Sequence, residues 1–361
     1  MHIGVPKETV AGERRVALVP DVAGKLVKAG HALTIEAGAG VEAGAPDEAY
    51  GAAGVAVGDP WNADVVCKVQ KPDASEIGKL REGASLIGLL QAATNPDLVR
   101  QLAQRRITAF SLELLPRITR AQAMDVLSSQ ATVAGYKAVL LAAAATGRFL
   151  PMLVTAAGTL PPARVLVLGA GVAGLQAIAT ARRLGGVVSA FDVRAAVKEQ
   201  IESLGAKFLA LDIGEQAETA GGYAKQLSED THRRELEFIA RHVKDADVVI
   251  TTAAIPGKRA PVLITADAVR GMKPGAVIVD LAVETGGNCE LAQAGSEVVH
   301  HGVRILGPTN LPATMPQHAS QMYARNVSAF LLHLTKDGAV NLDLTDEITK
   351  ATCVTHDGKV P

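Results

Sequence analysis

The sequence predicts an α/β protein built from two Rossmann-like, doubly wound parallel-sheet domains with a cleft between them. Short β-branched runs alternate with helical segments in both halves of the chain, which favours parallel strands covered by helices on both faces. A glycine-rich turn follows a buried strand near residue 170. The 361 residues, 48% of them hydrophobic, suffice for two domains that each bury a core.

The first half contains five short apolar runs that are typical of buried strands. They are residues 2–5, 32–36, 64–69, 85–90 and 107–112. Helix start signals lie between them, as at Pro20-Asp21 and Asn95-Pro96-Asp97. We therefore expect a first domain of alternating strands and helices.

A long alanine-rich helix is predicted over residues 121–145, polar at its start, apolar later and buried between the domains. Six further strands follow, at residues 164–168, 187–191, 207–211, 247–252, 276–281 and 303–306. Residues 315–334 have helical spacing and are expected to return to the first domain, ahead of a polar extension beyond about residue 336. The predicted domains are 1–135 plus 312–361, and 136–311.

Composition narrows the class of function. The 36 Lys and Arg nearly balance the 37 Asp and Glu, which argues against a strong field for nucleic acid or an anionic membrane. Three scattered cysteines form neither a disulfide framework nor a spaced zinc site, and none of the nine histidines makes a metal pattern, so we expect a cytoplasmic protein without metal. The charged N-terminus predicts no signal peptide, and the longest apolar run, residues 138–145, is far shorter than the roughly 20 residues of a spanning helix.

The glycine-rich turn has the sequence context of a dinucleotide site. The strand 164–168 runs into Gly169-Ala-Gly-Val-Ala-Gly174, and a helical segment follows. Gly169 would permit the tight turn, Gly171 would let a pyrophosphate approach the backbone, and Gly174 would let helix and strand pack closely. The first turn of the helix would offer free N–H groups to the phosphates.

An acidic residue at the end of the next strand predicts which dinucleotide binds. Asp192 lies 18 positions beyond Gly174, close to the spacing of a ribose-binding carboxylate, which favours NAD(H) over NADP(H). The alternative is a surface aspartate that caps a turn. Arg194 weakens the choice slightly, because a guanidinium two residues further on could accept a phosphate.

Along nearly its whole length the sequence resembles the NAD(H)-binding component of nicotinamide nucleotide transhydrogenase (alpha subunit, domain I), a family related to alanine dehydrogenase. The discriminating segments are 117–130 and the Gly-Gly-Tyr segment 218–225, because the glycine turn alone would admit many dehydrogenases. Further agreement lies in residues 6–8, 13–17, 169–174, 192–194, 251–257 and 280–288.

The resemblance implies that Arg117, Gln122 and Asp125 form the catalytic set. Arg117 would bond the carboxamide oxygen or a phosphate, Asp125 and Ser128 would fix the carboxamide, and Gln122 would reach a second nucleotide presented by another protein. Helix capping is the alternative for Asp125 and Ser128. The expected NAD(H)-binding residues are Arg117, Ile118, Thr119, Gln122, Asp125, Ser128, Gly169, Gly171, Val172, Gly174, Asp192, Val193, Arg194, Gly222, Tyr223 and Ala254.

Residues 212–228 form a long, glycine-containing segment that is predicted to be either a lid or surface disorder. The resemblance favours a mobile loop that closes over NAD(H), with Tyr223 near the adenosine or ribose. Gly222 and Ala254 would then line the cofactor crevice with backbone.

Hydride transfer between two nicotinamides needs positioning but no general base, nucleophile or metal. In alanine dehydrogenase, which must also move protons, a histidine follows the strand that matches residues 85–90, and this chain has Gln91 there. The relative's catalytic aspartate falls near Glu284. Both departures argue against amino-acid oxidation. Arg15 and Lys68 keep the relative's substrate-binding residue types, with salt bridges at partly exposed positions as the alternative.

The sequence therefore predicts the soluble NAD(H)-binding subunit of a proton-translocating NAD(P) transhydrogenase. The resemblance implies a homodimer whose partners are an NADP(H)-binding subunit and a transmembrane subunit, held peripherally on the cytoplasmic side of the inner membrane by these partners. No nucleic acid and no direct membrane insertion are expected. The alternatives are an alanine dehydrogenase-like enzyme and a non-catalytic NAD(H)-binding regulatory module.

Overall fold

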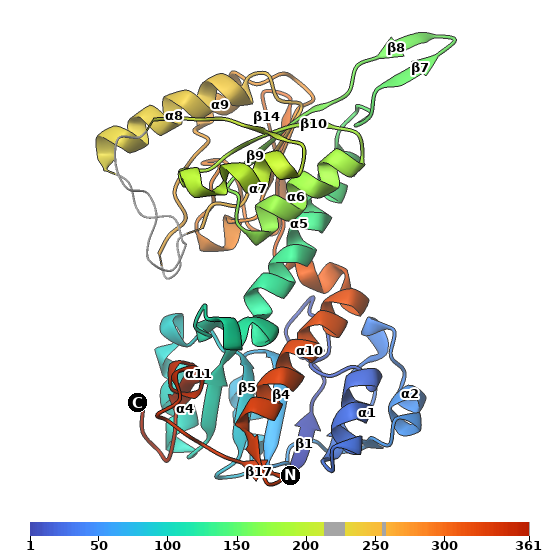
Figure 1. Cartoon of the computed structure of the whole chain (residues 1–361), viewed down its shortest axis with the longest axis vertical. Helices are drawn as coiled ribbons and strands as arrows, with labels where there is room; N and C mark the ends of the chain where they lie inside the picture. Colours follow the sequence, from blue (N-terminus) through green and yellow to red (C-terminus); the bar gives the residue numbers. More distant parts are fainter. Residues whose placement is uncertain (213–227, 255–257, 361) are drawn as a thin grey trace. The chain divides into compact units, whose positions relative to one another are not determined.

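The computed structural model describes residues 1–212, 228–254 and 258–360, which form two compact units (Figure 1). Unit 1 comprises Met1–Gln130 and Pro312–Pro361, and unit 2 comprises Ala131–Leu311. Each unit contains a seven-stranded sheet that is mainly parallel. The predicted class of two Rossmann-like α/β domains is confirmed. The predicted loop 212–228, including Gly222 and Tyr223, lies almost entirely outside the described residues.

The sheet of unit 1 has the order β18-β6-β5-β4-β1-β2-β3, and only the edge strand β18 is antiparallel. The strands are β1 (His2–Val5), β2 (Ala32–Ile35), β3 (Ala56–Val57), β4 (Val65–Gln70), β5 (Ser85–Leu89), β6 (Thr108–Ser111) and β18 (Cys353–Thr355). All five predicted strands are present, with ends that differ by at most one residue. The sequence did not predict β3 or β18.

The C-terminal segment corrects the prediction of a polar extension beyond residue 336. It contains a small hairpin of β16 (Thr335–Lys336) and β17 (Ala339–Val340), then α11 (Glu347–Thr352) and β18. The Thr355 hydroxyl donates to the Ile107 carbonyl at 2.8 Å and accepts from the Ala109 amide at 3.2 Å. The tail is ordered because these bonds join it to β6.

Helices cover the sheet of unit 1 and close its core. They are α1 (Pro20–Lys28), α2 (Asp47–Ala52), α3 (Ala74–Lys79), α4 (Pro96–Gln104) and α10 (Pro316–Leu334), with 3-10 turns η1 (Val41–Ala43), η2 (Ala92–Thr94), η3 (Leu112–Leu114), η4 (Thr119–Met124) and η7 (Leu311–Thr314). The α10 helix returns to unit 1, as predicted, and buries Tyr323, Val327 and Phe330 completely. The Phe330 ring meets Phe110 of β6 edge to face at 5.5 Å.

The sheet of unit 2 has the order β11-β10-β9-β12-β13-β15-β14, and β14 at its edge is antiparallel. The strands are β9 (Arg164–Leu168), β10 (Val187–Phe191), β11 (Lys207–Phe208), β12 (Val248–Thr251), β13 (Val277–Asp280), β14 (Ser296–His300) and β15 (Val303–Gly307). All six predicted strands are present, although β11 ends three residues before the predicted 211. The strand order reverses between β9 and β12, which is where open α/β sheets bind ligands.

The remaining elements of unit 2 are helices on both faces of the sheet and one projecting hairpin (Figure 1). The helices are α6 (Val172–Arg183), α7 (Lys198–Ser203), α8 (Glu229–Val243) and α9 (Ala266–Arg270), with 3-10 turns η5 (Ala195–Val197) and η6 (Val283–Thr285). The hairpin, which the sequence did not predict, consists of β7 (Leu153–Thr155) and β8 (Gly158–Leu160).

The predicted helix 121–145 is shorter than expected. It is the 3-10 turn η4 followed by α5 (Val126–Ala145), because the Asp125 carboxylate accepts bonds from the amide and hydroxyl of Ser128 and caps a helix that begins at Val126. The predicted burial along its length is wrong, since Leu127 is 44% exposed and Tyr136 is 38% exposed. Among the described residues, only α5 is long and apolar enough to cross a membrane, a test that core helices of soluble proteins also pass.

Candidate functional site

The glycine turn of unit 2 joins β9 to α6 at the point where the strand order reverses. Gly169 has φ +95°, a conformation that side chains disfavour, and a Cβ on Gly174 would lie 1.9 Å from the Gly169 oxygen. Gly171 is the N-cap of α6 and makes no side-chain cap, and a Cβ there would meet no atom within 4 Å. The turn thus leaves open space at the N-terminus of a 12-residue helix, where the first N–H groups and the helix dipole attract anions.

Asp192 follows β10 and lies beside this turn. Its carboxylate accepts a 2.7 Å bond from the Ala170 amide and a 2.9 Å bond from the Arg194 amide, so it does cap a turn. It is not a surface residue, however, because it is only 8% exposed. The intervening Val193 is partly buried against the core of unit 2. The structure therefore brings the predicted ribose carboxylate and the predicted phosphate turn together.

The chain that leaves β12 lies beside the same turn and is held by buried polar groups. The Thr252 hydroxyl donates to the Gly169 carbonyl at 3.1 Å. The fully buried Asn288 amide accepts from the Ala253 N–H at 3.0 Å and donates to the Ala253 carbonyl at 2.8 Å. These bonds fix the backbone just before the exposed Ala254. The residues that follow, 255–257, lie outside the described ranges.

Asp280 is the centre of this buried group. Its carboxylate is fully buried and accepts four bonds of 2.8–2.9 Å, from the Thr251 hydroxyl and the amides of Ala282, Asn288 and Cys289. Burial raises the pKa of Asp280, whereas these bonds lower it, and the net shift is upward. The family resemblance included this segment but gave Asp280 no role.

Replacing Asp280 with asparagine is expected to lower the free energy of unfolding by about 3 kcal/mol, because the new NH2 group faces donors and leaves some of them buried without an acceptor. Urea unfolding followed by circular dichroism measures this change. Asp267→Asn is the control, since its ion pair with Arg270 is exposed and should be worth less than about 0.5 kcal/mol. Equal effects of the two variants would contradict the structural importance of Asp280.

In unit 1, five of the predicted site residues line one cavity of about 260 Å³. The lining residues are Pro116, Arg117, Ile118, Thr119, Ala121, Gln122 and Asp125. Ser128 is joined to this group through its bonds to Asp125, at 2.6 and 2.9 Å. The capping contact expected as the alternative for Asp125 and Ser128 is therefore present. A carboxylate has about four acceptor positions, so the cap does not exhaust those of Asp125.

The loop around this cavity is held by the C-terminal segment of unit 1. The Arg120 guanidinium, on η4, donates to the Asp346 carboxylate at 2.7 Å, and the Asn326 amide of α10 donates to the Ala123 carbonyl at 2.8 Å. Burial alone would raise the pKa of Asp346, but the bonds from Arg120 and the Thr349 amide and the charge of His333 lower it to about 2. The tail thus supports the predicted site loop.

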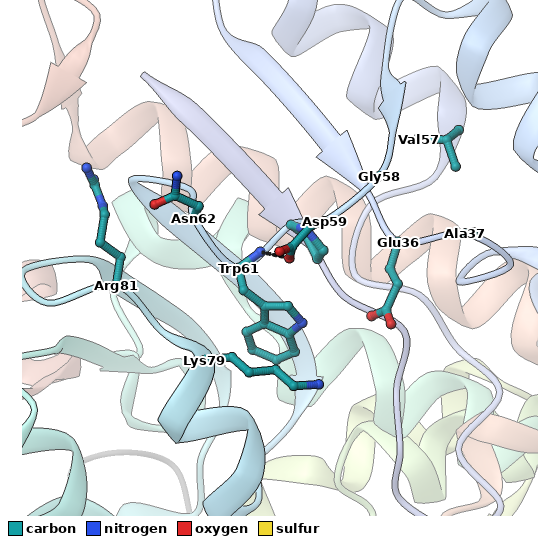
Figure 2. Close-up of a pocket in the computed structure, with 10 residues that line it drawn as sticks. Glu36, Ala37, Val57, Gly58, Asp59, Trp61, Asn62, Lys79 and Arg81 are labelled. Carbon is teal, nitrogen blue, oxygen red and sulfur yellow. Dashed lines mark hydrogen bonds between the residues drawn. The ribbon is translucent and has the colours of Figure 1, made fainter.

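A second hollow in unit 1, of about 770 Å³, involves none of the predicted site residues (Figure 2). Lys79 lies over the Trp61 ring at 5.4 Å, and the Asp59 carboxylate accepts from the Trp61 amide. The hollow is lined by Glu36, Ala37, Val57, Gly58, Asp59, Pro60, Trp61, Asn62, Lys79 and Arg81. Its acidic and basic side chains together favour no single class of ligand.

Arg15 and Lys68 are buried, which corrects the expectation that they are partly exposed. Arg15 is 3% exposed and pairs with Glu13 at 2.6 Å, and Lys68 is fully buried. The Lys68 ammonium lies 2.8 Å from Glu76 and 3.3 Å from Glu8. Both cations therefore make internal salt bridges, which supports the alternative to substrate binding.

The two positions that differ from alanine dehydrogenase are exposed. Gln91 directly follows β5 and its neighbour Leu90, and has φ +51°, an uncommon conformation for a residue other than glycine. Glu284 is the second residue of η6, and its carboxylate accepts from the Asn310 amide at 3.2 Å. Neither side chain stands in place of a buried general acid or base.

Known proteins resemble this chain over its whole length. The chain matches the N-terminal domain of the alanine dehydrogenase/PNT family over residues 4–134 and the C-terminal domain over residues 138–361. It is 51% identical to the first of the alpha-subunit chains of NAD(P) transhydrogenase from Rhodospirillum rubrum, over 100% of this chain and 97% of the relative. A solved transhydrogenase from Sinorhizobium meliloti superposes with a TM-score of 0.92 at 46% identity, with 100% of both chains covered. A solved L-alanine dehydrogenase gives 0.85 at 29% identity, over 100% of this chain and 96% of that one.

Proposed function

Because the chain belongs to the alanine dehydrogenase/PNT family, we propose that it is the NAD(H)-binding subunit of a proton-translocating NAD(P) transhydrogenase. In this role it takes part in direct hydride transfer between its own NAD(H) and NADP(H) bound by a partner subunit. The proposal keeps the predicted domains, 1–135 with 312–361 and 136–311 for NAD(H). The observation that carries it is the open glycine turn beside a buried Asp192, combined with similarity to transhydrogenase over the whole chain.

The residues of unit 2 fit a bound dinucleotide. Gly171 leaves space at the N-terminus of α6, where a pyrophosphate would be held by backbone N–H groups, and Asp192 is placed to accept ribose hydroxyls. Gly169, Val172, Gly174, Val193 and Arg194 complete this set. Ala254 follows β12 at the same edge, and Gly222 and Tyr223 are kept as proposed contacts. NAD(H), when bound, supplies the carbon that donates or accepts the hydride.

The chemistry asks little of the protein beyond positioning, because hydride moves between two nicotinamides with no change at a hydroxyl or amine. We propose that Arg117 and Asp125 orient the carboxamide of NAD(H), with Ile118, Thr119 and Ser128 around them. Gln122 would contact the partner's nucleotide. The shared cavity of Arg117, Gln122 and Asp125 supports their acting as one group.

The salt bridges of Arg15 and Lys68 disfavour the alanine dehydrogenase-like alternative. A 2-oxo acid would need an available cation, and each of these two is already paired with a buried carboxylate. Gln91 and Glu284 also lack the residue types on which the resemblance places that enzyme's proton transfers. The third alternative, a regulatory module without hydride transfer, differs from the proposal only in activity.

The decisive experiment mixes the purified chain and NADH with a transhydrogenase NADP(H)-binding domain loaded with the thionicotinamide analogue of NADP⁺. Reduction of the analogue shifts its absorbance away from that of NADH, so transfer is seen directly. A parallel reaction holds pyruvate and ammonium instead. Transfer only with the partner domain supports the proposal, oxidation with pyruvate and ammonium supports the dehydrogenase, and NADH binding without either reaction supports the regulatory module.

We also propose a homodimer, attached at the cytoplasmic side of the inner membrane only through its partner subunits. An isolated two-stranded hairpin is marginal in water, and β7–β8 exposes apolar side chains. Val154 is 73% exposed, Met152 60% and Leu160 46%. A second copy of the chain that covers this hairpin would remove these side chains from water.

Replacing Val154 with lysine is expected to convert the dimer into monomers, because it places a charge in the covered surface. Sedimentation velocity measures the change. Val299→Lys is the matched control, since Val299 is 63% exposed on β14 and should leave the dimer intact. A dimer that persists in Val154→Lys would contradict the role of the hairpin.

A further inference from the structure

The carboxylate of Asp192 is already saturated with hydrogen bonds. Two come from backbone amides, those of Ala170 and Arg194, at 2.7 and 2.9 Å. Two more come from the Arg194 guanidinium, whose Nε donates to Oδ1 at 2.9 Å and whose Nη2 donates to Oδ2 at 2.8 Å. A carboxylate offers about four acceptor positions, so these bonds leave it little capacity for a further donor.

Only the guanidinium among these donors can leave without moving the backbone. The amides of Ala170 and Arg194 are fixed by the glycine turn and by the end of β10. The guanidinium approaches as a fork of two adjacent donors, one to each carboxylate oxygen. Two neighbouring hydroxyls of a ribose present donors in the same manner. Arg194 therefore occupies the hydrogen-bonding positions that the ribose of a bound dinucleotide requires.

The pair also changes the local charge. The side chain of Asp192 is 5% exposed and that of Arg194 is 13% exposed, so water screens their attraction only weakly. While the pair is formed, the positive guanidinium offsets the repulsion of Asp192 for a 2′-phosphate. Once released, the same guanidinium can reach a phosphate. Arg194 therefore reduces the preference for NAD(H) in two ways.

We propose that Arg194 is an internal competitor for the adenosine ribose of NAD(H), and that it limits both NADH affinity and discrimination against the 2′-phosphate of NADPH. The inference rests on the proposed NAD(H) site and adds to it a residue that determines specificity. Binding of NADH requires release of at least one guanidinium bond, and the free energy of that release is lost from the affinity.

The test compares NADH and NADPH binding, by nucleotide fluorescence, to the wild-type chain and to Arg194→Gln. We expect the variant to bind NADH about 10-fold more tightly and NADPH no more tightly, because an unpaired carboxylate accepts hydroxyls and repels phosphate. Arg194→Lys, which keeps the charge but cannot make the fork, should give a smaller gain. Arg233→Gln, which removes an exposed arginine of the same unit, controls for net charge and should change neither affinity.

A double-substitution cycle separates competition from simple support of the site. In an Asp192→Asn background the guanidinium loses its charged partner, so Arg194→Gln should no longer increase NADH affinity. Unchanged or weaker NADH binding by Arg194→Gln in the wild-type background would overturn the inference, and weaker binding would mean that Arg194 only supports Asp192. A wild-type chain that binds no NADH would overturn the proposed function itself, and this inference with it.

Discussion

Gly171→Ala is expected to fold normally and to bind NADH about 100-fold more weakly, a loss of about 3 kcal/mol. The residue has φ −73° and ψ −170°, which alanine adopts freely, and a Cβ there meets no atom of the protein within 4 Å. The stability should fall by no more than about 1 kcal/mol, the usual cost of alanine at an N-cap. The space that a methyl group would occupy is the space proposed for the pyrophosphate. NADH fluorescence titration and urea unfolding measure the two effects.

Gly174→Ala is the matched control three residues away. Its Cβ would lie 1.9 Å from the Gly169 oxygen, so the start of α6 must move away from β9. We expect this variant to lose about 3 kcal/mol of stability from overpacking. The two substitutions thus distinguish space for a ligand from space needed for packing. NADH bound by Gly171→Ala with wild-type affinity would contradict the proposed position of the pyrophosphate.

The sequence predicted the interior strands because each is an apolar run that ends at turn residues. It missed the elements whose positions depend on a partner strand. Both residues of β3 are exposed, β14 buries no residue fully, and β18 has only three residues. Such strands have no hydrophobic pattern of their own, and their pairing is set by the neighbouring strand across the sheet.

The candidate site was predictable where a local motif determines its geometry. The turn at Gly169–Gly174 and the carboxylate at Asp192 follow from strand, turn and spacing, and the residues around Arg117 were found only through the resemblance to a family. The pairing of Arg194 with Asp192 was not predicted, because a residue two positions away in sequence can face either solvent or its neighbour. The four bonds to Asp280 depend on contacts up to 29 residues apart, which spacing does not reveal.

The buried salt bridges of unit 1 lay furthest from sequence reasoning. Lys68 lies on β4, Glu76 on α3 and Glu8 after β1, and only the folded sheet brings them together. Resemblance suggested that Lys68 is a substrate contact, whereas its complete burial and two carboxylate partners indicate a structural role. A substitution that removes the cation tests this interpretation directly.

Lys68→Met is expected to lower the free energy of unfolding by about 3–5 kcal/mol, because it leaves the carboxylates of Glu8 and Glu76 buried without their cation. Methionine keeps most of the length of the side chain, so the loss comes mainly from charge rather than from a cavity. Urea unfolding measures the change. The triple variant Lys68→Met, Glu8→Gln, Glu76→Gln is the control, and it should recover most of the stability because no uncompensated charge remains.

The penalty of Lys68→Met should also depend on pH. Burial raises the pKa of Glu8 above 4.5, against the opposing effect of Lys68, and loss of the lysine raises that pKa further. A raised pKa means that the folded state binds the proton more tightly, so this contribution to stability is complete below pH 4.5 and is lost as the pH rises through the folded value. The variant should therefore be closer to wild type at about pH 5 than at about pH 8. A penalty independent of pH, or NADH binding that fails in a variant still folded, would contradict a purely structural Lys68 and reopen the dehydrogenase alternative.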